Sequence, residues 1–274
     1  MPDPKRSTCP PAVRRACPPT RPPKLQRRGK PRRRRVGFVG CPPEELLAPR
    51  RSQDLIDLDN LIEGVAPRSE TLLPRTTCHI IRRILDNALA LPLDEIIIDE
   101  GLGKCDAARG LAELLRGLLD IPILRTQNQN QQPAGAPISD SALPLRRKIE
   151  LILESLVHPS VVPARLPPEP HPRAAIWGVP AADLSLYELF PDGSQVLGWS
   201  RCLENRTPAD WELEMHVPEQ APTVFFAQAF CPKNVVARHL ARKHNGLHVD
   251  ADGVLSQPVK AKIEAFLRFR KVWR

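Results

Sequence analysis

The chain has 274 residues, of which 42% are hydrophobic and 4% aromatic, so aliphatic side chains must form most of its core. Its net charge of +9 is unevenly spread, because residues 1–35 hold 13 of the 40 basic residues and one of the 31 acidic residues. The remaining 27 basic and 30 acidic residues leave the body slightly acidic, which argues against a folded nucleic-acid-binding domain.

The apolar runs and the cysteines indicate in which cellular compartment the protein is expected. No run approaches the roughly 18 apolar residues that a membrane span needs, and the basic leader lacks the apolar core of a secretory signal. Seven cysteines in a chain of this length, without such a signal, are not typical of a disulfide framework. We expect free or metal-bound thiols in a reducing cytoplasm.

Residues 1–35 form a basic leader with nine prolines and the run RRGKPRRRR, a composition that cannot build a core, so we expect disorder. The leader is either a tail that binds an acidic partner or nucleic acid, or an extension without function, and we favour the second. No structural role is expected for its Cys9 and Cys17.

Strands and helices alternate in the next segment, residues 36–127, which we interpret as an N-terminal α/β lobe. Alternation of this kind is typical of a parallel, doubly wound sheet. The stretch between 49 and 70 is polar and stays unassigned. The predicted strands are 36–40, 71–74, 95–99 and 121–126, and the predicted helices begin at Pro43, extend over 79–91 and follow Asp106 as N-cap.

A second α/β unit follows a linker. Residues 128–172 are interpreted as this linker, with one amphipathic helix over 143–157 and a proline-rich end. Residues 173–274 form the predicted C-terminal lobe. Its strands are expected at 174–178, 195–199, 223–230 and 246–250, and its helices at 183–190, 234–244 and 259–269. The predicted fold is therefore two Rossmann-like lobes with a crevice between their strand ends.

Five cysteines share one context, after a strand-like run and before a helix start: Cys41, Cys78, Cys105, Cys202 and Cys231. In an open α/β sheet, the strand ends that lead into helices line the ligand crevice. The best ligand candidates are Cys78, Cys105 and Cys231, because helix N–H groups stabilise a thiolate at such a position. Cys41 and Cys202 lie near the same edge without being ligands, and His79 is interpreted as a packing or hydrogen-bonding residue.

The wide spacing of these cysteines limits the kind of metal site. Structural zinc sites use close C-x₂₋₄-C pairs, and the sequence has none. An iron–sulfur cluster accepts wide spacing, and three thiolates would leave one iron open for a substrate. The alternative is that all are core cysteines, which are common, and spacing alone slightly favours that alternative.

Four segments in a fixed order carry a resemblance to a known family. They are CPPEELL (41–47), TTCHIIRRILDNAL (76–89), KCDAARGLAELL (104–115), and AFCPKNV (229–235) followed by GLHVDADGVLSQPVKAKIEAFL (246–267). Together they resemble the D-component family of 2-hydroxyacyl-CoA dehydratases, which includes benzoyl-CoA reductase subunits and double-cubane cluster proteins. The resemblance extends over most of residues 36–270.

The resemblance implies an iron–sulfur enzyme or enzyme subunit, a lyase or a reductase. The cysteines that match Cys78, Cys105 and Cys231 hold a [4Fe–4S] cluster in that family, and Glu45 matches its active-site glutamate. An ATP-dependent activator protein supplies a low-potential electron, a homologous subunit completes a homo- or heterodimer, and an acyl-CoA or another small molecule is the substrate. Because Glu45 also stands at a helix start, a purely structural role is equally consistent with the sequence.

Two other functions stay open. The body is shorter than typical family members between Cys41 and Cys78 and between Cys105 and Cys231, and it has no recognisable CoA-binding signature. The chain is therefore alternatively a non-catalytic iron–sulfur carrier, electron relay or assembly protein on the same scaffold. The second alternative is a metal-free α/β binding module. Nucleic-acid binding rests on the leader alone and is not expected as the main function.

Overall fold

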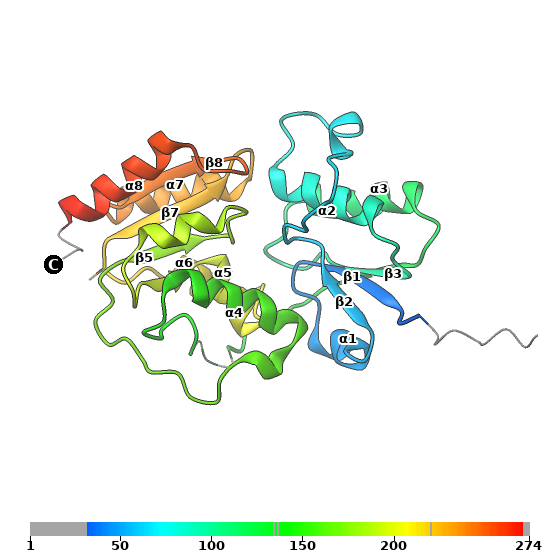
Figure 1. Cartoon of the computed structure of the whole chain (residues 1–274), viewed down its shortest axis with the longest axis horizontal. Helices are drawn as coiled ribbons and strands as arrows, with labels where there is room; N and C mark the ends of the chain where they lie inside the picture. The colour runs from blue at the N-terminus through cyan, green and yellow to red at the C-terminus, as the bar shows by residue number, and fades with distance from the viewer. Residues whose placement is uncertain (1–31, 134, 136, 220, 271–274) are drawn as a thin grey trace, which may run out of the picture. The chain divides into compact units, whose positions relative to one another are not determined.

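Two parallel sheets of four strands each form the framework of the part described by the computed structural model, residues 32–133, 135, 137–219 and 221–270 (Figure 1). The first sheet has the order β2-β1-β3-β4 and the second the order β6-β5-β7-β8, so the chain winds in the same way twice. This confirms the predicted α/β class with parallel sheets. The strands are β1 (Arg35–Val39), β2 (Asp54–Asp57), β3 (Glu95–Asp99), β4 (Ile123–Thr126), β5 (Ala175–Gly178), β6 (Gln195–Leu197), β7 (Thr223–Gln228) and β8 (Leu247–Ala251).

Helices connect these strands. They are α1 (Glu44–Leu47), α2 (His79–Ala90), α3 (Asp106–Leu118), α4 (Leu145–Val157), α5 (Trp199–Asn205), α6 (Trp211–Met215), α7 (Lys233–Lys243) and α8 (Gln257–Phe269), with 3₁₀ turns at Ala48–Arg50, Ser69–Thr71, Pro159–Val161 and Leu184–Leu189. Asp106, predicted as an N-cap, is instead the first residue of α3, and Cys105 is the N-cap. The helix predicted at 183–190 is a 3₁₀ helix, whose N-cap Asp183 accepts a hydrogen bond from the N–H of Ser185.

Two segments before α2 differ from the prediction. The polar stretch left unassigned contains β2, which pairs with β1 and places Leu55 beside Val36. The strand predicted at 71–74 is wrong, because the chain turns there. The carboxylate of Asp86 in α2 accepts hydrogen bonds from the N–H groups of Arg68 and Ser69 at 2.7 and 2.6 Å, and this holds the turn against the helix.

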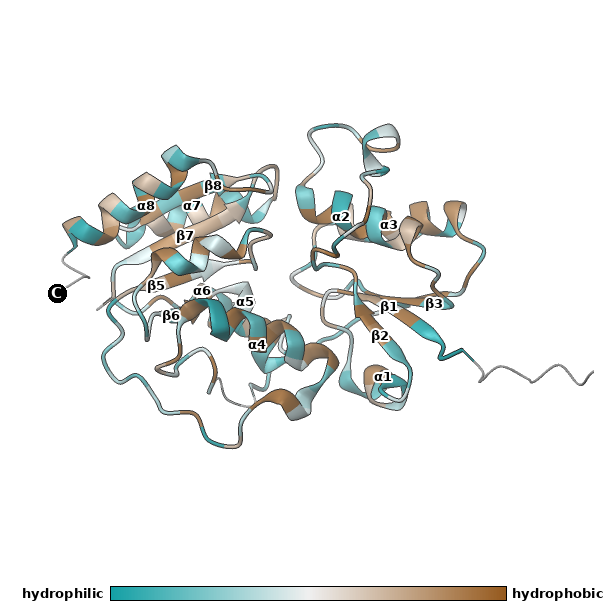
Figure 2. Ribbon diagram, in the orientation of Figure 1, coloured by the Kyte–Doolittle hydropathy of each residue, from teal (hydrophilic) through white to brown (hydrophobic). Residues whose placement is uncertain are grey.

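Helices α2 and α3 cover one face of the first sheet (Figure 1). Strand β3 is buried along its whole length, and Ile96 and Ile98 point from it toward Leu85 of α2 and Leu111 and Leu115 of α3. Figure 2 shows the strand and the inner sides of the helices as hydrophobic. The aliphatic runs of the sequence are therefore buried as the composition requires, since burial of each such side chain stabilises the fold by roughly 1.5–3 kcal/mol.

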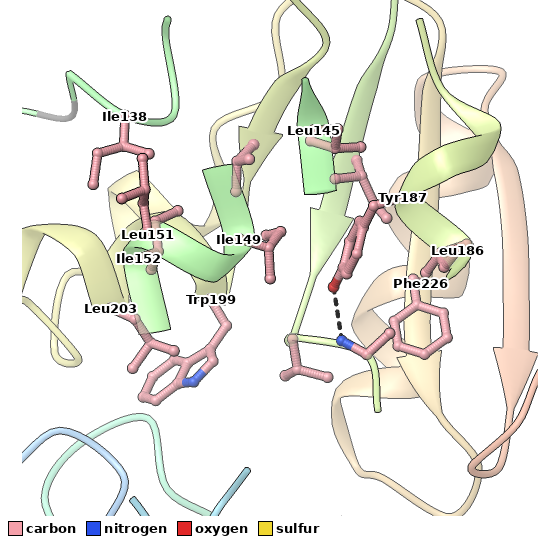
Figure 3. Close-up of a cluster of buried hydrophobic side chains, with 14 of the residues drawn as sticks. Ile138, Leu145, Ile149, Leu151, Ile152, Leu186, Tyr187, Trp199, Leu203 and Phe226 are labelled. Atoms are coloured by element: carbon pink, nitrogen blue, oxygen red, sulfur yellow. Dashed lines mark hydrogen bonds between the residues drawn. The ribbon is translucent and has the colours of Figure 1, made fainter. Parts of the chain in front are cut away.

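Helix α4 shares one core with both sheets. Its Ile149 and Ile152 belong to the same buried cluster as Phe38 of the first sheet and Val196 and Val224 of the second. Figure 3 shows Ile149 and Ile152 beside Leu151, Trp199 and Leu203. This helix lies in the segment predicted as a linker, and the predicted boundaries at 127/128 and 172/173 stay predictions.

The second sheet carries α7 on its other face. There Trp177 and Phe225 pack against Ala237 and Leu240, and the indole N–H of Trp177 donates to the carbonyl of Glu214 at 2.7 Å. Among the residues that the structure describes, no helix combines the length and apolarity needed to cross a bilayer. The predicted disordered leader lies outside the described residues up to position 31, and its last residue, Arg35, begins β1.

Candidate functional site

A cavity of about 1130 Å³ opens where strands of both sheets end at their carboxyl sides. Val39 and Gly40, at the end of β1, and Val179 and Pro180, directly after β5, form parts of its wall. In each sheet the chain leaves the first strand toward one neighbour and returns on its other side, which is the topological switch point where open α/β sheets bind ligands. The volume is large enough for a small organic molecule.

Cys78, Cys105 and Cys231 all line this cavity. Cys78 and Cys105 are the N-caps of α2 and α3, and Cys231 lies two residues before Lys233, the first residue of α7. Each thiol therefore stands where a helix presents unpaired N–H groups and the positive end of its dipole. The starts of α2, α3 and α7 thus bring the three predicted ligand residues to one cavity, although no strand directly precedes Cys78.

Cys78 and Cys231 share a proton. The thiol of Cys231 donates a hydrogen bond to Cys78, which lowers the pKa of Cys78 from 9.0 to about 6, and the N–H groups of Ile81 and Ile80 add to this effect. The pKa of Cys231 is raised because its proton is held in that hydrogen bond, because it is buried, and because the charges of Cys78 and Cys105 oppose a second thiolate. The pair thus carries one thiolate and one thiol at neutral pH.

The turn that precedes Cys231 is strained. Phe230 has φ +60°, in the left-handed region that a bulky side chain rarely adopts, and its ring is 57% exposed. The N–H of Cys231 donates to the carbonyl of Gln228 at 3.1 Å, which closes the turn from β7. A strained residue of this kind persists where the surrounding structure fixes it and is frequent at functional sites.

His79 lies on the cavity wall beside Asp252, with 3.4 Å between its Nδ1 and the Asp252 carboxylate. The same carboxylate accepts a hydrogen bond from Arg82 at 2.5 Å. Burial lowers the pKa of His79. This contact links α2 to the turn after β8, and the predicted packing or hydrogen-bonding role of His79 stays a prediction.

The three thiols differ from a site for one metal ion. Within the described ranges, no group of three or more His, Cys, Asp or Glu side chains is arranged to hold a metal ion. A cluster has another requirement, since each of its irons takes its own cysteine and the thiolates therefore stand around a larger body. The three sulfur donors on the wall of the cavity fit that requirement in type, and they are one fewer than the four that a four-iron cluster takes.

Glu45, the predicted catalytic residue, is exposed in the first turn of α1 and is not one of the cavity-lining residues. Its neighbour Glu44 is engaged instead, in ion pairs with Arg51 and Arg206. A catalytic role for Glu45 therefore stays a prediction that rests on the resemblance.

Cys41 and Cys202 are buried, each 1% exposed, away from the cavity-lining set. Burial raises the pKa of Cys41 to about 11 and raises that of Cys202 further, so both stay protonated. Cys202 lies inside α5 rather than before a helix as predicted, because Gly198, with φ +70°, ends the strand segment and starts the helix early. Both side chains belong to the buried core, and their exclusion from the ligand set stays a prediction.

The sequence analysis missed a cluster of charged residues on the cavity wall. Asp57 ends β2 and its oxygens accept hydrogen bonds from the N–H of Asp59 and the side chain of Asn60, at 3.0 and 3.1 Å. Asp59 accepts one from the N–H of Gly40, and Arg83 donates to the main-chain carbonyl of Asp59 at 2.9 Å. The residues Asp54–Asp57 (DLID) do not alternate strictly between polar and apolar, so the sequence contains no clear strand signal here.

Two lysines add positive charge to the wall of the cavity. The ammonium groups of Lys104 and Lys233 lie 4.4 and 4.7 Å from the ring centroid of Trp199, distances at which a cation is attracted to the ring. Lys104 is 3.7 Å from the buried carboxylate of Asp99, and Lys233 pairs with buried Glu214. The cavity therefore combines an apolar lining with fixed cations on one side.

Comparison with protein-family models and with curated proteins gives no match for this chain.

Proposed function

We propose that this chain is an iron–sulfur protein of the 2-hydroxyacyl-CoA dehydratase and benzoyl-CoA reductase type. In this proposal Cys78, Cys105 and Cys231 hold a [4Fe–4S] cluster for low-potential one-electron chemistry on an acyl-CoA or another small molecule. The observation that carries it is the convergence of these three cysteines, from the starts of α2, α3 and α7, on one cavity.

The local chemistry of the sulfur atoms supports the proposal. A thiolate is the form that binds iron, and the lowered pKa of Cys78 makes it a thiolate before any metal arrives. Binding of iron would release the proton that Cys231 holds, since metal ligands must be deprotonated. Helix N-termini behind Cys78 and Cys105 lower the cost of the remaining charge.

The number of thiols supports an open coordination site. Cys41 and Cys202 are buried and do not line the cavity, so three cysteines of the described residues are available there. Three thiolates would leave one iron of a four-iron cluster without a cysteine ligand from these residues. When bound, the cluster supplies electron transfer and a Lewis-acidic iron to a substrate.

The chain's own residues would hold and enclose that substrate. Apolar wall residues such as Ile84, Leu156 and Trp199 exclude water, and Lys104 and Lys233 attract anionic parts of a ligand. The resemblance adds an ATP-dependent activator protein, a homologous subunit, Glu45 as an acid or base, and a place in the cytoplasm.

The test is an anaerobic preparation of the full chain, assayed for iron and acid-labile sulfide and examined by EPR after reduction. We expect roughly four iron and four sulfide per chain, lost on Cys105→Ser and strongly reduced on Cys78→Ser or Cys231→Ser. Cys202→Ala is the matched control and should keep the iron. Protein that stays iron-free after anaerobic reconstitution, or iron that survives all three substitutions, would contradict the proposal.

A second candidate is an iron–sulfur carrier or assembly protein on the same scaffold. The observation that favours it is the partial exposure of Cys105 and Cys231, which would let a cluster pass to an acceptor. It predicts transfer of iron and sulfide to an apo-ferredoxin within minutes, without turnover of any acyl-CoA. Retention of the cluster in the presence of that acceptor would exclude it.

A further inference from the structure

A polar corner of the cavity carries groups that the cysteine chemistry does not use. Asp57, Asp59, Asn60 and Arg83 all line the cavity at the carboxyl ends of β1 and β2. Their positions follow from the local fold, since Gly40 with φ +77° turns its N–H toward the carboxylate of Asp59. These hydrogen bonds hold both carboxyl groups in place before any ligand binds.

Two of the three guanidinium nitrogens of Arg83 have no hydrogen-bond partner. Its side chain is 8% exposed, and one terminal nitrogen donates to the main-chain carbonyl of Asp59. Its Nε and its second terminal nitrogen have no hydrogen-bond partner. A buried donor left unpaired is unfavourable, so an oxygen atom that accepts from Arg83 would be bound favourably.

The charges around this corner do not balance unless one carboxyl group keeps its proton. Asp57, Asp59 and Asp99 are three acids, and Arg83 and Lys104 are the two cations that act on them. Burial raises the pKa of Asp57 well above its ordinary range, and the charge of Asp59 raises it further. Burial also raises the pKa of Asp59.

The neighbouring elements add further charges, and these do not remove the excess of acid. From α2, the Cys78 thiolate acts on Arg83, and from the turn after β8, Asp252 does the same. Lys104, before α3, lies 3.7 Å from the Asp99 carboxylate. Its positive charge therefore acts on Asp99 as well as on Asp57 and Asp59. The corner therefore holds a carboxyl group that keeps its proton and a guanidinium with two unpaired nitrogens, both hydrogen-bond donors, on residues that line the same cavity.

We propose that Asp57, Asp59 and Arg83 form a second subsite of the cavity, which binds an uncharged hydroxyl or carbonyl oxygen of the substrate and donates a proton to it. An anionic group would add negative charge to a corner that already has one acid too many, whereas a neutral oxygen accepts from both donors. The inference rests on the proposed function, because that function supplies the substrate and the electron.

The proton transfer balances for a 2-hydroxyacyl thioester. A low-potential electron donor adds one electron to the thioester, and the C–O bond to the hydroxyl group then breaks with its electron pair on oxygen. The O–H bond of the carboxyl group breaks as the new O–H bond forms, so the hydroxyl group leaves as water and a neutral radical stays on the acyl group. The carboxylate that remains is stabilised by Arg83 and Lys104, the cations that already act on the pair.

The test has two readouts on the full chain. Infrared spectra of the metal-free protein at pH 7 should contain a carboxylic-acid absorption that is lost on Asp57→Asn or Asp59→Asn. The matched control is Asp54→Asn, because Asp54 stands at the other end of the same strand with a side chain that is 51% exposed. The control should keep the absorption.

The second readout is binding of lactoyl-CoA and propionyl-CoA, which differ by the one hydroxyl group. Wild-type protein with its cluster should bind lactoyl-CoA about tenfold more tightly, the value of one well-formed hydrogen bond. Asp57→Asn and Arg83→Gln should reduce this preference to about one while iron and sulfide stay unchanged. Absence of the acid absorption, binding of neither thioester, or a preference unchanged in both variants would overturn the subsite. Loss of iron, by contrast, would count against the cluster.

Discussion

Two groups of cysteines with the same sequence context end in opposite environments. Cys78 and Cys231 line the cavity and share one proton, and Cys105 stands beside them at a helix N-terminus. Cys41 and Cys202 are packed in the interior with raised pKa values. The comparison teaches that a strand-to-helix position is not enough for a reactive thiol, and that hydrogen-bond donors and access to the cavity decide.

The largest expected contrast is in alkylation of the metal-free protein at pH 7. With pKa values of about 6 and about 11, the thiolate fractions of Cys78 and Cys41 differ by about 10⁴. The weaker nucleophilicity of the less basic thiolate takes back about 10², so Cys78 should react at least about a hundredfold faster with iodoacetamide. Mass spectrometry of the labelled peptides measures both alkylation rates. As the pH is lowered, the alkylation rate of Cys78 should fall with a midpoint near pH 6. Equal labelling of Cys78 and Cys41 in the folded protein would contradict the proposed difference between the two environments.

A smaller effect is expected when the Asn128 side chain, which packs beside the buried Cys41, is removed. The Asn128 side chain is 5% exposed and donates to the carbonyls of Cys41 and Arg206, at 3.0 and 3.4 Å. Asn128→Ala should lower the free energy of unfolding by about 1–3 kcal/mol, because it removes the side-chain donor to the buried Cys41 carbonyl, and it should speed alkylation of Cys41. The control is Asn130→Ala, since exposed Asn130 donates to the same Arg206 carbonyl. It should change stability by less than about 0.5 kcal/mol. A reversed order, measured by urea unfolding, would contradict this account.

The smallest effect is expected when one cysteine from each environment is replaced by serine. Cys202→Ser places a hydroxyl group at a site whose sulfur has a weak contact, 3.7 Å from the carbonyl of Asp210. The variant should lose about 1 kcal/mol of stability, because burial of a poorly paired hydroxyl group is unfavourable. Cys105→Ser, at a partly exposed N-cap, should change the unfolding free energy of the metal-free protein by less than about 0.5 kcal/mol. Similar losses for both variants, in the same urea titrations, would show that the two environments do not differ as described.

Much of the sheet framework could be predicted from the sequence, because strands such as β3 and β7 are continuous apolar runs bounded by turns. Strand β2 could not, since it has four residues, begins and ends with an aspartate, and is identified as a strand only by its pairing with β1. The helix at Cys202 was misplaced because the positive φ of Gly198 sets its start, and backbone conformation of this kind leaves no periodic signal.

The candidate site was accessible to sequence reasoning only in part. The cysteines at helix starts could be selected from their context, and they line one cavity. The polar corner could not be foreseen, because Arg83 lies between apolar residues of α2 and reads as part of a solvated helix face. Its burial depends on the segment around Asp59, which reaches it from β2 and occupies one of its nitrogens.

Helix α4 has a consequence for how the chain folds. Because Ile149 and Ile152 fill one cluster with side chains of both sheets, neither sheet can complete its core while this helix is detached. The cores of both sheets are therefore complete only after α4, which lies between them in the chain, has packed against them. A break within Leu145–Val157 would leave each fragment with an exposed apolar face that favours aggregation. We expect the two sheets to melt in one cooperative transition, in which the segment that joins them in sequence also joins them in stability.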